Sequence, residues 1–296
     1  MIEALKKLKI GKIIKSPKMS EYTTYKVGGK ALAVVYPDNT DKLIKLLDYL
    51  HKENIKYKIL GNGSNLIFSD DTYEGVIIKL DEFNNLEIKN NIVTVGAGYN
   101  LIKLSLKVAR LGLVGLEFAS GIPGTVGGAV YMNAGAYKSD MGYVVREVKV
   151  LTPDLKIKTL YNKDMNFHYR SSFLQENPGF ICLEAKIVLR KGDPDAILEV
   201  IKERKQRRII TQPLEYPSAG SVFRNPSNDF AGRLIEELGY KGKHIGGAYV
   251  SEKHANFIIN KDNAKASDIR KLITEIKEKV KEKYNIDLIV EQEFVD

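Results

Sequence analysis

The apolar residues of the first hundred positions follow a strand, helix, strand order. Residues 32–36 and 57–60 are short apolar runs typical of buried strands. Between them, leucines recur three and four positions apart after Asn39, a residue type that often precedes a helix. Further apolar runs at 75–80 and 92–98 predict two more strands. The pattern indicates that the chain begins with an α/β unit.

A second helix is predicted between Asn100, a suitable N-cap, and Gly112, a residue type that often ends a helix. The glycine-rich passage 115–137 then interrupts the periodic pattern. Beyond it, apolar runs predict three further strands, near 146–150, 156–160 and 180–189.

A helix starts cleanly at Asp193 and Pro194, because proline at the first helical position loses no hydrogen bond. We place a domain boundary just before it. The rest of the chain predicts a short helix at 229–238 and a strand at 256–260. A long amphipathic helix is predicted from Ser267, and a closing strand at 286–295. The elements together predict an α+β protein with an N-terminal arm, a larger domain of two α/β subdomains and a C-terminal domain, at 1–22, 23–190 and 191–296.

Two loops have a composition suited to a phosphate-bearing ligand, one at 60–70 and one within 115–137. A loop dense in glycine, serine, threonine and asparagine can aim backbone N–H groups at phosphate oxygens that approach closely. Tight turns packed with small residues are the alternative explanation. Two such loops, with Thr24 and further glycines nearby, favour the ligand.

The first loop is not the Rossmann dinucleotide fingerprint. That motif places its glycines between a strand and a helix, whereas residues 61–65 lead into the extended apolar run 66–68. The P-loop pattern is absent as well.

Composition and charge change this picture little. The chain is 44% hydrophobic and 28% charged, and no apolar run reaches the ~20 residues that cross a bilayer. The N-terminal segment lacks the pattern of a signal peptide, so we expect a cytoplasmic protein without a membrane partner. The net charge of +9 raises the possibility of a nucleic-acid partner. Lysines alternate with acidic residues, as in 275–284, which favours solvated helix faces and no nucleic-acid partner.

Cysteine and histidine offer no obvious chemistry. The single cysteine, Cys182, lies in an apolar stretch and is predicted to be a buried strand thiol. His51, His168 and His244 have no metal-ligand spacing, and no metal is predicted.

Six segments of the chain resemble a known family: YTTYKVGGKA, LGNGSNLI, GLEFASGIPGTVGGAVYMNAGAY, YRSSF, PSAGSVFRNP and IGGAYVSEKHANFIIN. The resemblance is to UDP-N-acetylenolpyruvoylglucosamine reductases, also called UDP-N-acetylmuramate dehydrogenases, and it spans residues 20–295. It implies an FAD-binding domain of the p-cresol methylhydroxylase and vanillyl-alcohol oxidase type, followed by a smaller α/β substrate domain. The implied cofactor is non-covalent FAD, reduced by NADPH. The implied substrate is UDP-N-acetylglucosamine enolpyruvate, reduced to UDP-N-acetylmuramate for peptidoglycan synthesis, and we expect a monomer.

The reduction needs a hydride, a group that stabilises the developing negative charge, and a proton. The resemblance implies that flavin N5 gives the hydride, that Arg170 stabilises the charge and that Ser221 gives the proton. A family glutamate, found in a pattern like LEPEV, corresponds here to Glu291, which we prefer, or to Glu293 after a two-residue slip. Both residues share a strand face, so facing alone cannot decide between them.

Binding residues are assigned in two groups. For FAD they are Thr24, Gly61, Asn62, Gly63, Ser64, Asn65, Leu66, Ser120, Gly121, Pro123, Gly124, Thr125, Gly127, Gly128 and Ala129. For the substrate they are Asn225, Arg208, Lys243 and His254, with Arg207 and Lys241 as alternative cations for the diphosphate.

Some family members carry an extra tyrosine-bearing loop over the substrate. Here YRSSF is followed closely by the strand 180–189, so we expect the shorter type. Two other functions remain open: a flavin-dependent oxidase of the same fold, and a basic nucleic-acid-binding protein without catalysis.

Overall fold

The computed structural model describes residues 1–296, and the contacts divide the chain into two compact units. Unit 1 comprises residues 1–15, 33–62 and 75–205, and unit 2 comprises residues 16–32, 63–74 and 206–296. The units defined by contacts begin and end at other residues than the predicted domains, whose boundaries stay a prediction.

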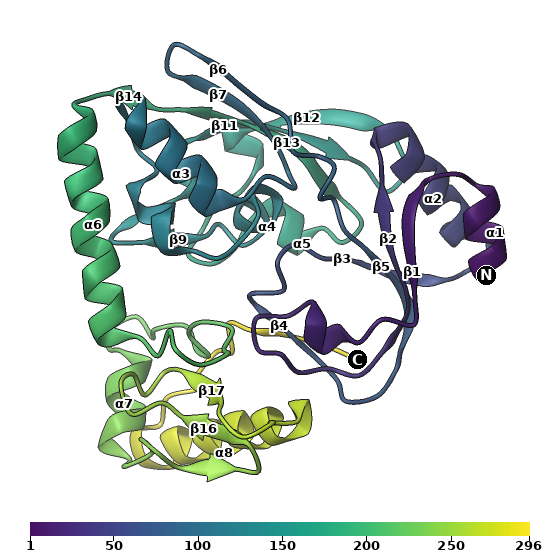
Figure 1. Ribbon diagram of the computed structural model, residues 1–296. Helices are drawn as coiled ribbons and strands as arrows, with labels where there is room; N and C mark the ends of the chain where they lie inside the picture. Colours follow the sequence, from purple (N-terminus) through teal and green to yellow (C-terminus); the bar gives the residue numbers. More distant parts are fainter. The chain divides into compact units, whose positions relative to one another are not determined.

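The first sheet of unit 1 is the predicted α/β unit with one extra strand (Figure 1). Its strand order is β1 (Gly11–Lys15), β2 (Ala31–Pro37), β5 (Tyr73–Ile78) and β3 (Lys56–Ile59). The predicted helix is α2 (Thr40–Lys52), whose first turn donates a 3.0 Å hydrogen bond from Lys42 N to Asn39 Oδ1. A short helix, α1 (Ile2–Lys7), precedes β1. Leu5 and Ile10 are fully buried, so the start of the chain packs into the core of unit 1.

The second sheet of unit 1 is antiparallel and five-stranded. Its order is β12 (Ile157–Tyr161), β11 (Val145–Leu151), β13 (Ile181–Val188), β7 (Ile92–Gly96) and β6 (Leu86–Lys89). The helix predicted after Asn100 is α3 (Leu101–Arg110), and Asn100 Oδ1 accepts from Lys103 N at 2.9 Å. Cys182 lies on β13 as predicted, and burial raises the pKa of its thiol to about 12.

The glycine-rich passage is more regular than the sequence pattern indicated. It contains a 3-10 helix, η2 (Glu117–Gly121), and the helix α4 (Val126–Tyr131). Thr125 explains the second, because its Oγ1 accepts a 3.3 Å hydrogen bond from Gly128 N and caps α4. The remaining short elements of unit 1 are β8 (Leu113–Val114), β9 (Gly135–Ala136), β10 (Ser139–Asp140), η3 (Met141–Tyr143), η4 (Asn162–Asp164), α5 (Phe173–Glu176) and β14 (Arg190–Lys191).

In unit 2 the long helix α8 (Ala266–Tyr284) packs against a small antiparallel sheet (Figure 1). The sheet consists of β15 (His244–Ile245), β16 (Ala248–Val250) and β17 (Ile258–Asn260). The predicted short helix is α7 (Ala231–Glu237), and η1 (Met19–Glu21) lies near the start of this unit's chain. Helix α6 (Pro194–Thr211) begins in unit 1 and ends in unit 2.

The closing strand is shorter than predicted. Only β18 (Glu293–Val295) forms a ladder, parallel to β4 (Leu66–Phe68). The preceding residues meet a single partner through the bridge between Val290 and Phe223, so no continuous strand forms over 286–292.

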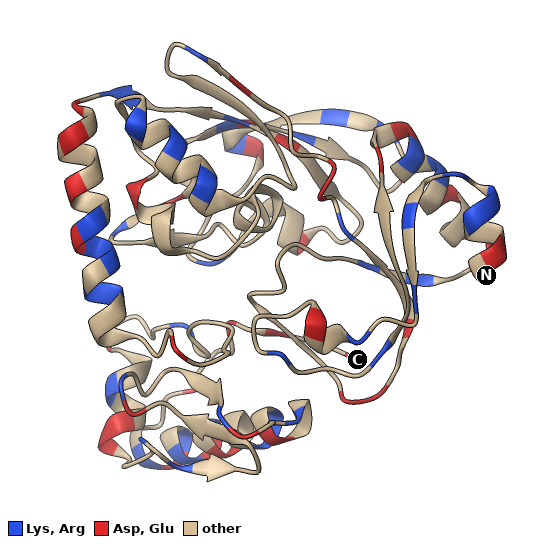
Figure 2. Cartoon of the chain, in the orientation of Figure 1, with Lys and Arg blue, Asp and Glu red and all other residues tan.

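Basic and acidic residues are mixed along α8 (Figure 2). This arrangement is the one expected of a solvated helix face. None of the helices combines the length and the apolar composition that a membrane-crossing segment needs.

Helix α8 is capped by a residue far away in sequence. The carboxylate of Asp70 accepts hydrogen bonds from Ala266 N at 2.7 Å and from Ser267 N at 3.0 Å. Partial burial opposes ionisation, but the hydrogen bonds from Ser267 and Ala266 and the charge of Lys265 hold the pKa of Asp70 below its ordinary value.

We expect Asp70→Ala to lower the free energy of unfolding by about 1 kcal/mol at pH 7, because two N–H groups of the first turn lose their acceptor. The folded pKa is depressed, so this stabilisation is complete above the unfolded pKa of about 3.9 and is lost as the pH falls through the folded value. Urea denaturation of parent and variant should therefore give stabilities that converge below about pH 4. A difference that stays constant with pH would show that the carboxylate charge plays no part.

Candidate functional site

The two predicted glycine loops lie against each other in unit 1. A Cβ on Gly61 would come within 2.8 Å of Thr125 Oγ1. Asn62 Nδ2 donates a 3.4 Å hydrogen bond to the carbonyl of Pro123. Residues from the end of β3 and from the start of α4 therefore form one surface.

The second loop leaves backbone bare at two positions. A Cβ on Gly124 would meet no atom within 4 Å, and one on the exposed Gly128 would meet only Thr125 Oγ1, at 3.4 Å. Neither glycine has a positive φ, so the backbone conformation does not require glycine at 124 or 128, and the space around both positions does not require it either. Close approach of a ligand to the backbone does explain why glycine occupies these two positions. These residues therefore fit the phosphate-bearing part of FAD.

Other residues assigned to FAD have packing roles within the loop. A Cβ on Gly127 would lie 2.9 Å from the Cβ of Ala97, and Gly127 N donates to Ala97 O at 2.8 Å. The hydroxyl of Ser120 donates to Glu117 O at 2.9 Å, and Ala129 is buried. Gly127 thus allows α4 to lie close to the end of β7.

Lys79 supports the first loop and was missed by the sequence analysis. Its side chain is only 11% exposed, and Nζ donates a 2.7 Å hydrogen bond to the carbonyl of Gly61. Asp81 lies 3.2 Å from the same Nζ. The only sequence signal was a lysine at the end of the apolar run 75–80, since buried lysines are rare without partners.

Arg170 occupies the tip of a tight turn in unit 1. His168 and Ser171 exchange two backbone hydrogen bonds of 3.1 Å, and Arg170 between them has a φ of 58°. The half-buried guanidinium lies over the ring of Tyr169, with Cζ 5.4 Å from the ring centroid. Holding a bulky residue in the left-handed region costs energy, so the surrounding contacts must stabilise this turn.

The turn of Arg170 is tied to the C-terminal end of α4. Asn133 Nδ2 donates to His168 O at 2.8 Å, and the buried Ser172 hydroxyl donates to Tyr131 O at 2.6 Å. Helix α4, which contains Gly128, and the residues after it therefore also hold the turn of Arg170 in place.

In unit 2, the segment of Thr24 lies against Gly63. Gly63 has a φ of 62°, and a Cβ there would lie 2.2 Å from Tyr22 O. Thr24 N donates to Gly63 O at 3.2 Å. Asn65 Nδ2 donates to Glu291 O at 3.0 Å, so this predicted FAD residue also holds the C-terminal segment.

Unit 2 brings Ser221 and Glu291 together. Glu291 N donates a 2.8 Å hydrogen bond to the carbonyl of Val222, which follows Ser221 in the chain. Both residues are half-buried. Glu293 is paired elsewhere, since its N–H donates to Asn65 O at 2.9 Å. The geometry therefore supports Glu291 over Glu293 as the neighbour of Ser221, and the assignment itself stays a prediction.

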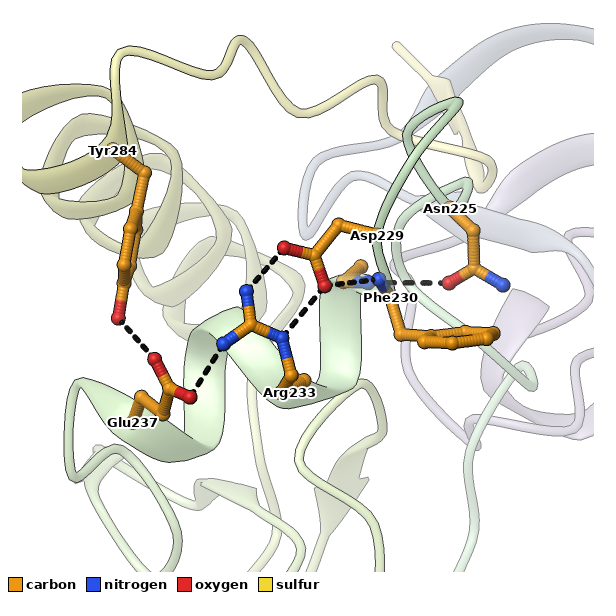
Figure 3. Close-up of polar contacts among 7 residues, drawn as sticks. Asn225, Asp229, Phe230, Arg233, Glu237 and Tyr284 are labelled. Carbon is orange, nitrogen blue, oxygen red and sulfur yellow. Dashed lines mark hydrogen bonds and ion pairs between the residues drawn. The ribbon is translucent and has the colours of Figure 1, made fainter.

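Asn225 has a structural contact that the sequence analysis did not anticipate. Its Oδ1 accepts a 3.1 Å hydrogen bond from Ala231 N at the start of α7. Figure 3 shows the amide nitrogen of Asn225 pointing away from this helix. The same view shows Arg233 held between Asp229 and Glu237 along α7. Only the amide N–H groups of Asn225 are directed away from the cap, so they are the ones suited to a ligand.

The remaining substrate candidates have local contacts. Arg208 Nε donates to Gln212 Oε1 at 2.9 Å, and Lys243 Nζ lies 4.1 Å from the ring centroid of Tyr240. Lys241 is paired with Glu236 at 2.7 Å, which favours Lys243 of the two lysines.

His254 is part of a turn rather than an open site. Its Nδ1 accepts from Asn256 N at 3.2 Å, and its ring lies 4.9 Å from that of Phe257. Burial lowers the pKa of His254, which favours the neutral ring.

Two family models match the chain. Residues 31–161 match an FAD binding domain, and residues 212–295 match the C-terminal domain of UDP-N-acetylenolpyruvoylglucosamine reductase. The predicted fold class, an FAD-binding domain followed by a smaller C-terminal domain, is confirmed. The matched FAD-binding domain places the chain among FAD-dependent oxidoreductases.

Full-length relatives narrow this class. UDP-N-acetylenolpyruvoylglucosamine reductase of Anoxybacillus flavithermus is 45% identical over 294 residues, covering 99% of this chain and 97% of the relative. The reductase of Bacillus subtilis is 42% identical over 296 residues, covering 100% and 98%. The crystal structure of the enzyme from Thermus caldophilus superposes with a TM-score of 0.82 at 34% identity, covering 96% and 98%. The chain belongs to the UDP-N-acetylenolpyruvoylglucosamine reductase family.

The connection that could hold an extra loop is short in this member. Only residues 177–180 separate α5 from β13.

Proposed function

We propose that the protein reduces the enolpyruvyl ether of UDP-N-acetylglucosamine to UDP-N-acetylmuramate with electrons from NADPH, in peptidoglycan precursor synthesis. The observation that carries the proposal is similarity along the whole chain to reductases named for this substrate. The cytoplasmic location and the monomeric state stay predictions.

FAD, when bound, would supply two-electron redox chemistry between NADPH and the substrate. The bare backbone at Gly124 and Gly128 and the joined loop of Gly61 and Asn62 would hold its phosphates. Lys79 keeps the carbonyl of Gly61 in place by its buried hydrogen bond. These residues fix the cofactor without any covalent link.

Arg170 stabilises the negative charge that develops at the substrate carboxylate. A planar guanidinium can give two parallel hydrogen bonds to a carboxylate, and its charge persists at any physiological pH. The tight turn between His168 and Ser171 fixes its position before the substrate binds. Such preorganised charge stabilisation is usually the largest contribution to catalysis.

Ser221 gives the proton to the substrate carbon, and Glu291 assists it. A serine hydroxyl is a weak acid, so it needs a fixed position and a neighbour that stabilises the transfer. The backbone pairing of Glu291 with Val222 provides such a neighbour. Glu291 acts as a hydrogen-bonding group, because a bare carboxylate beside a developing anion would be unfavourable.

The function is tested by following NADPH oxidation anaerobically, with and without the enolpyruvyl substrate, and by mass spectrometry of the product. We expect NADPH oxidation beyond the single equivalent that reduces the bound flavin only with the substrate, and a product with two additional hydrogens. In heavy water, the hydrogen that is added to the substrate as a proton should be deuterium. No conversion of the enolpyruvyl substrate, with oxygen consumption when a small alcohol replaces NADPH, would instead indicate an oxidase.

The choice between the two glutamates is directly testable. We expect Glu291→Gln to lower kcat at least ~10-fold, and Glu293→Gln to lower it less than ~3-fold, because only Glu291 adjoins the segment of Ser221. The two substitutions are isosteric and serve as controls for each other. The reverse order in steady-state kinetics would establish the slipped alignment.

A further inference from the structure

We propose that Gln292 is a positioning residue that holds the Ser221 segment in its reactive conformation. The inference rests on the proposed role of Ser221 as proton donor. It assigns a task to a residue that lies between the two candidate glutamates and that the family resemblance does not explain.

Gln292 is buried, with only 4% of its surface exposed, and its side chain faces the core of unit 2. Its amide Nε2 lies within hydrogen-bond distance of three consecutive carbonyls, those of Ala219 at 3.2 Å, Gly220 at 3.2 Å and Ser221 at 3.4 Å. One amide group thus contacts the whole turn that precedes and includes Ser221.

The other end of the amide is fixed as well. The hydroxyl of the fully buried Tyr25 donates a 3.3 Å hydrogen bond to Gln292 Oε1. This bond orients the amide so that its nitrogen faces the turn. Tyr25 therefore acts on Ser221 through Gln292.

The turn needs such support because its own backbone is permissive. Gly220 has a φ of 75°, and a Cβ there would meet no atom within 4 Å, so packing does not confine this residue. The following residues are held by Asn256, whose side chain bonds both the N–H and the carbonyl of Phe223, at 2.9 and 2.8 Å. Gln292 plays the corresponding role for the residues before Ser221, because its amide bonds their carbonyls.

The position of a proton donor controls its rate strongly, since an error of about 1 Å costs up to ~10²-fold. A buried amide that bonds backbone carbonyls fixes position without adding charge beside the reacting carbon. Glutamine at 292 thus allows the residues at 291 and 293 to remain the only carboxylates of this segment.

The experiment compares the holoenzyme with Gln292→Met, which keeps the side chain's length but removes its donors, and with Tyr25→Phe, which removes only the hydroxyl. Tyr240→Phe is the matched control, because its hydroxyl also donates within unit 2, to Glu275 at 2.8 Å, but does not touch the Ser221 turn. Rapid mixing measures cofactor reduction by NADPH and reoxidation by substrate separately. Hydrogen exchange measures the backbone protection of residues 219–223.

For Gln292→Met we expect reoxidation to fall about tenfold, reduction by NADPH to stay unchanged, and exchange to rise in 219–223. Tyr25→Phe should show the same pattern with about a threefold effect, and Tyr240→Phe should show neither change. In the Ser221→Ala background, Gln292→Met should cause no further loss, since both act through one group.

If both Gln292→Met and Tyr25→Phe leave the hydrogen exchange of residues 219–223 unchanged, the inference is overturned, whether or not Ser221 is the proton donor. Equal losses in both half-reactions, or a full further loss in the double variant, would also overturn it, because they indicate a general structural role. Suppose that Ser221→Ala alone is reoxidised at the parental rate while hydrogen exchange still rises in Gln292→Met. The proposed role of Ser221 as proton donor is then wrong, whereas the ordering of residues 219–221 by Gln292 remains supported.

Discussion

Ser221→Ala should leave cofactor binding, folding and reduction by NADPH near the parental level, while reoxidation by the enolpyruvyl substrate falls by ~10² or more. A factor of this size is typical of losing a positioned general acid. The two half-reactions separate the proton donor from everything else, because the hydride step from NADPH needs no proton from this serine. The measurement is the absorbance of the bound flavin after rapid mixing, first with NADPH and then with substrate.

The control for Ser221→Ala is Ser221→Cys, which keeps a side chain able to give a proton. We expect this variant to retain part of the reoxidation rate that the alanine variant loses. If the alanine variant is reoxidised as fast as the parent, Ser221 is only a turn residue. That outcome is informative because the contacts of Gly220 and Val222 are made by their backbone groups, so neither substitution at Ser221 removes a partner of them.

Much of the fold followed from the apolar pattern, because long periodic segments bury one face and leave few alternatives. The helices after Asn39 and Asn100 have the predicted caps. Helix α8 begins at Ala266, one residue before the predicted start, and its first two N–H groups donate to Asp70, nearly two hundred residues away. A cap from so distant a residue has no signal in the local sequence.

The glycine passage and the C-terminus were harder to predict for a different reason. Glycine disfavours helices in isolation, yet α4 forms because Thr125 caps it and Gly127 packs against Ala97. Near the C-terminus, the stretch 286–292 resembles a strand but has only the bridge to Phe223 as a partner. Strand formation depends on a partner that the run itself does not encode.

The candidate site also contains residues that the sequence could indicate and residues that it could not. The glycines, Arg170 and Ser221 could be assigned from the sequence because their motifs are long and specific. Lys79 and Gln292 were missed because they act by buried hydrogen bonds to carbonyls that are distant in sequence. Asn225 shows the converse, since a residue assigned to the substrate also caps α7. Backbone carbonyls and N–H groups are present at every position, so sequence alone cannot say which of them a side chain meets.

Gly128→Val should abolish binding of FAD while leaving the protein folded. Gly128 is exposed, has no positive φ, and a Cβ there would meet only Thr125 Oγ1, at 3.4 Å. The protein itself therefore has room for a side chain at this position. A branched side chain would stand on the backbone surface that is proposed to meet the cofactor's phosphates. The measurements are the flavin content of the purified variant and the affinity for added FAD, which we expect to fall by more than ~10²-fold.

The matched variants are Gly124→Val, at the second bare position, and Gly127→Val, at a packed one. Gly124→Val should also lose FAD and remain folded, because a Cβ there meets no atom within 4 Å. Gly127→Val should lose FAD through damage to the fold, since its Cβ would lie 2.9 Å from that of Ala97. Thermal unfolding of the three variants without cofactor distinguishes these causes: only Gly127→Val should unfold at a clearly lower temperature. If Gly128→Val and Gly124→Val bind FAD like the parent, the cofactor does not approach this loop and the assignment of the glycines is wrong.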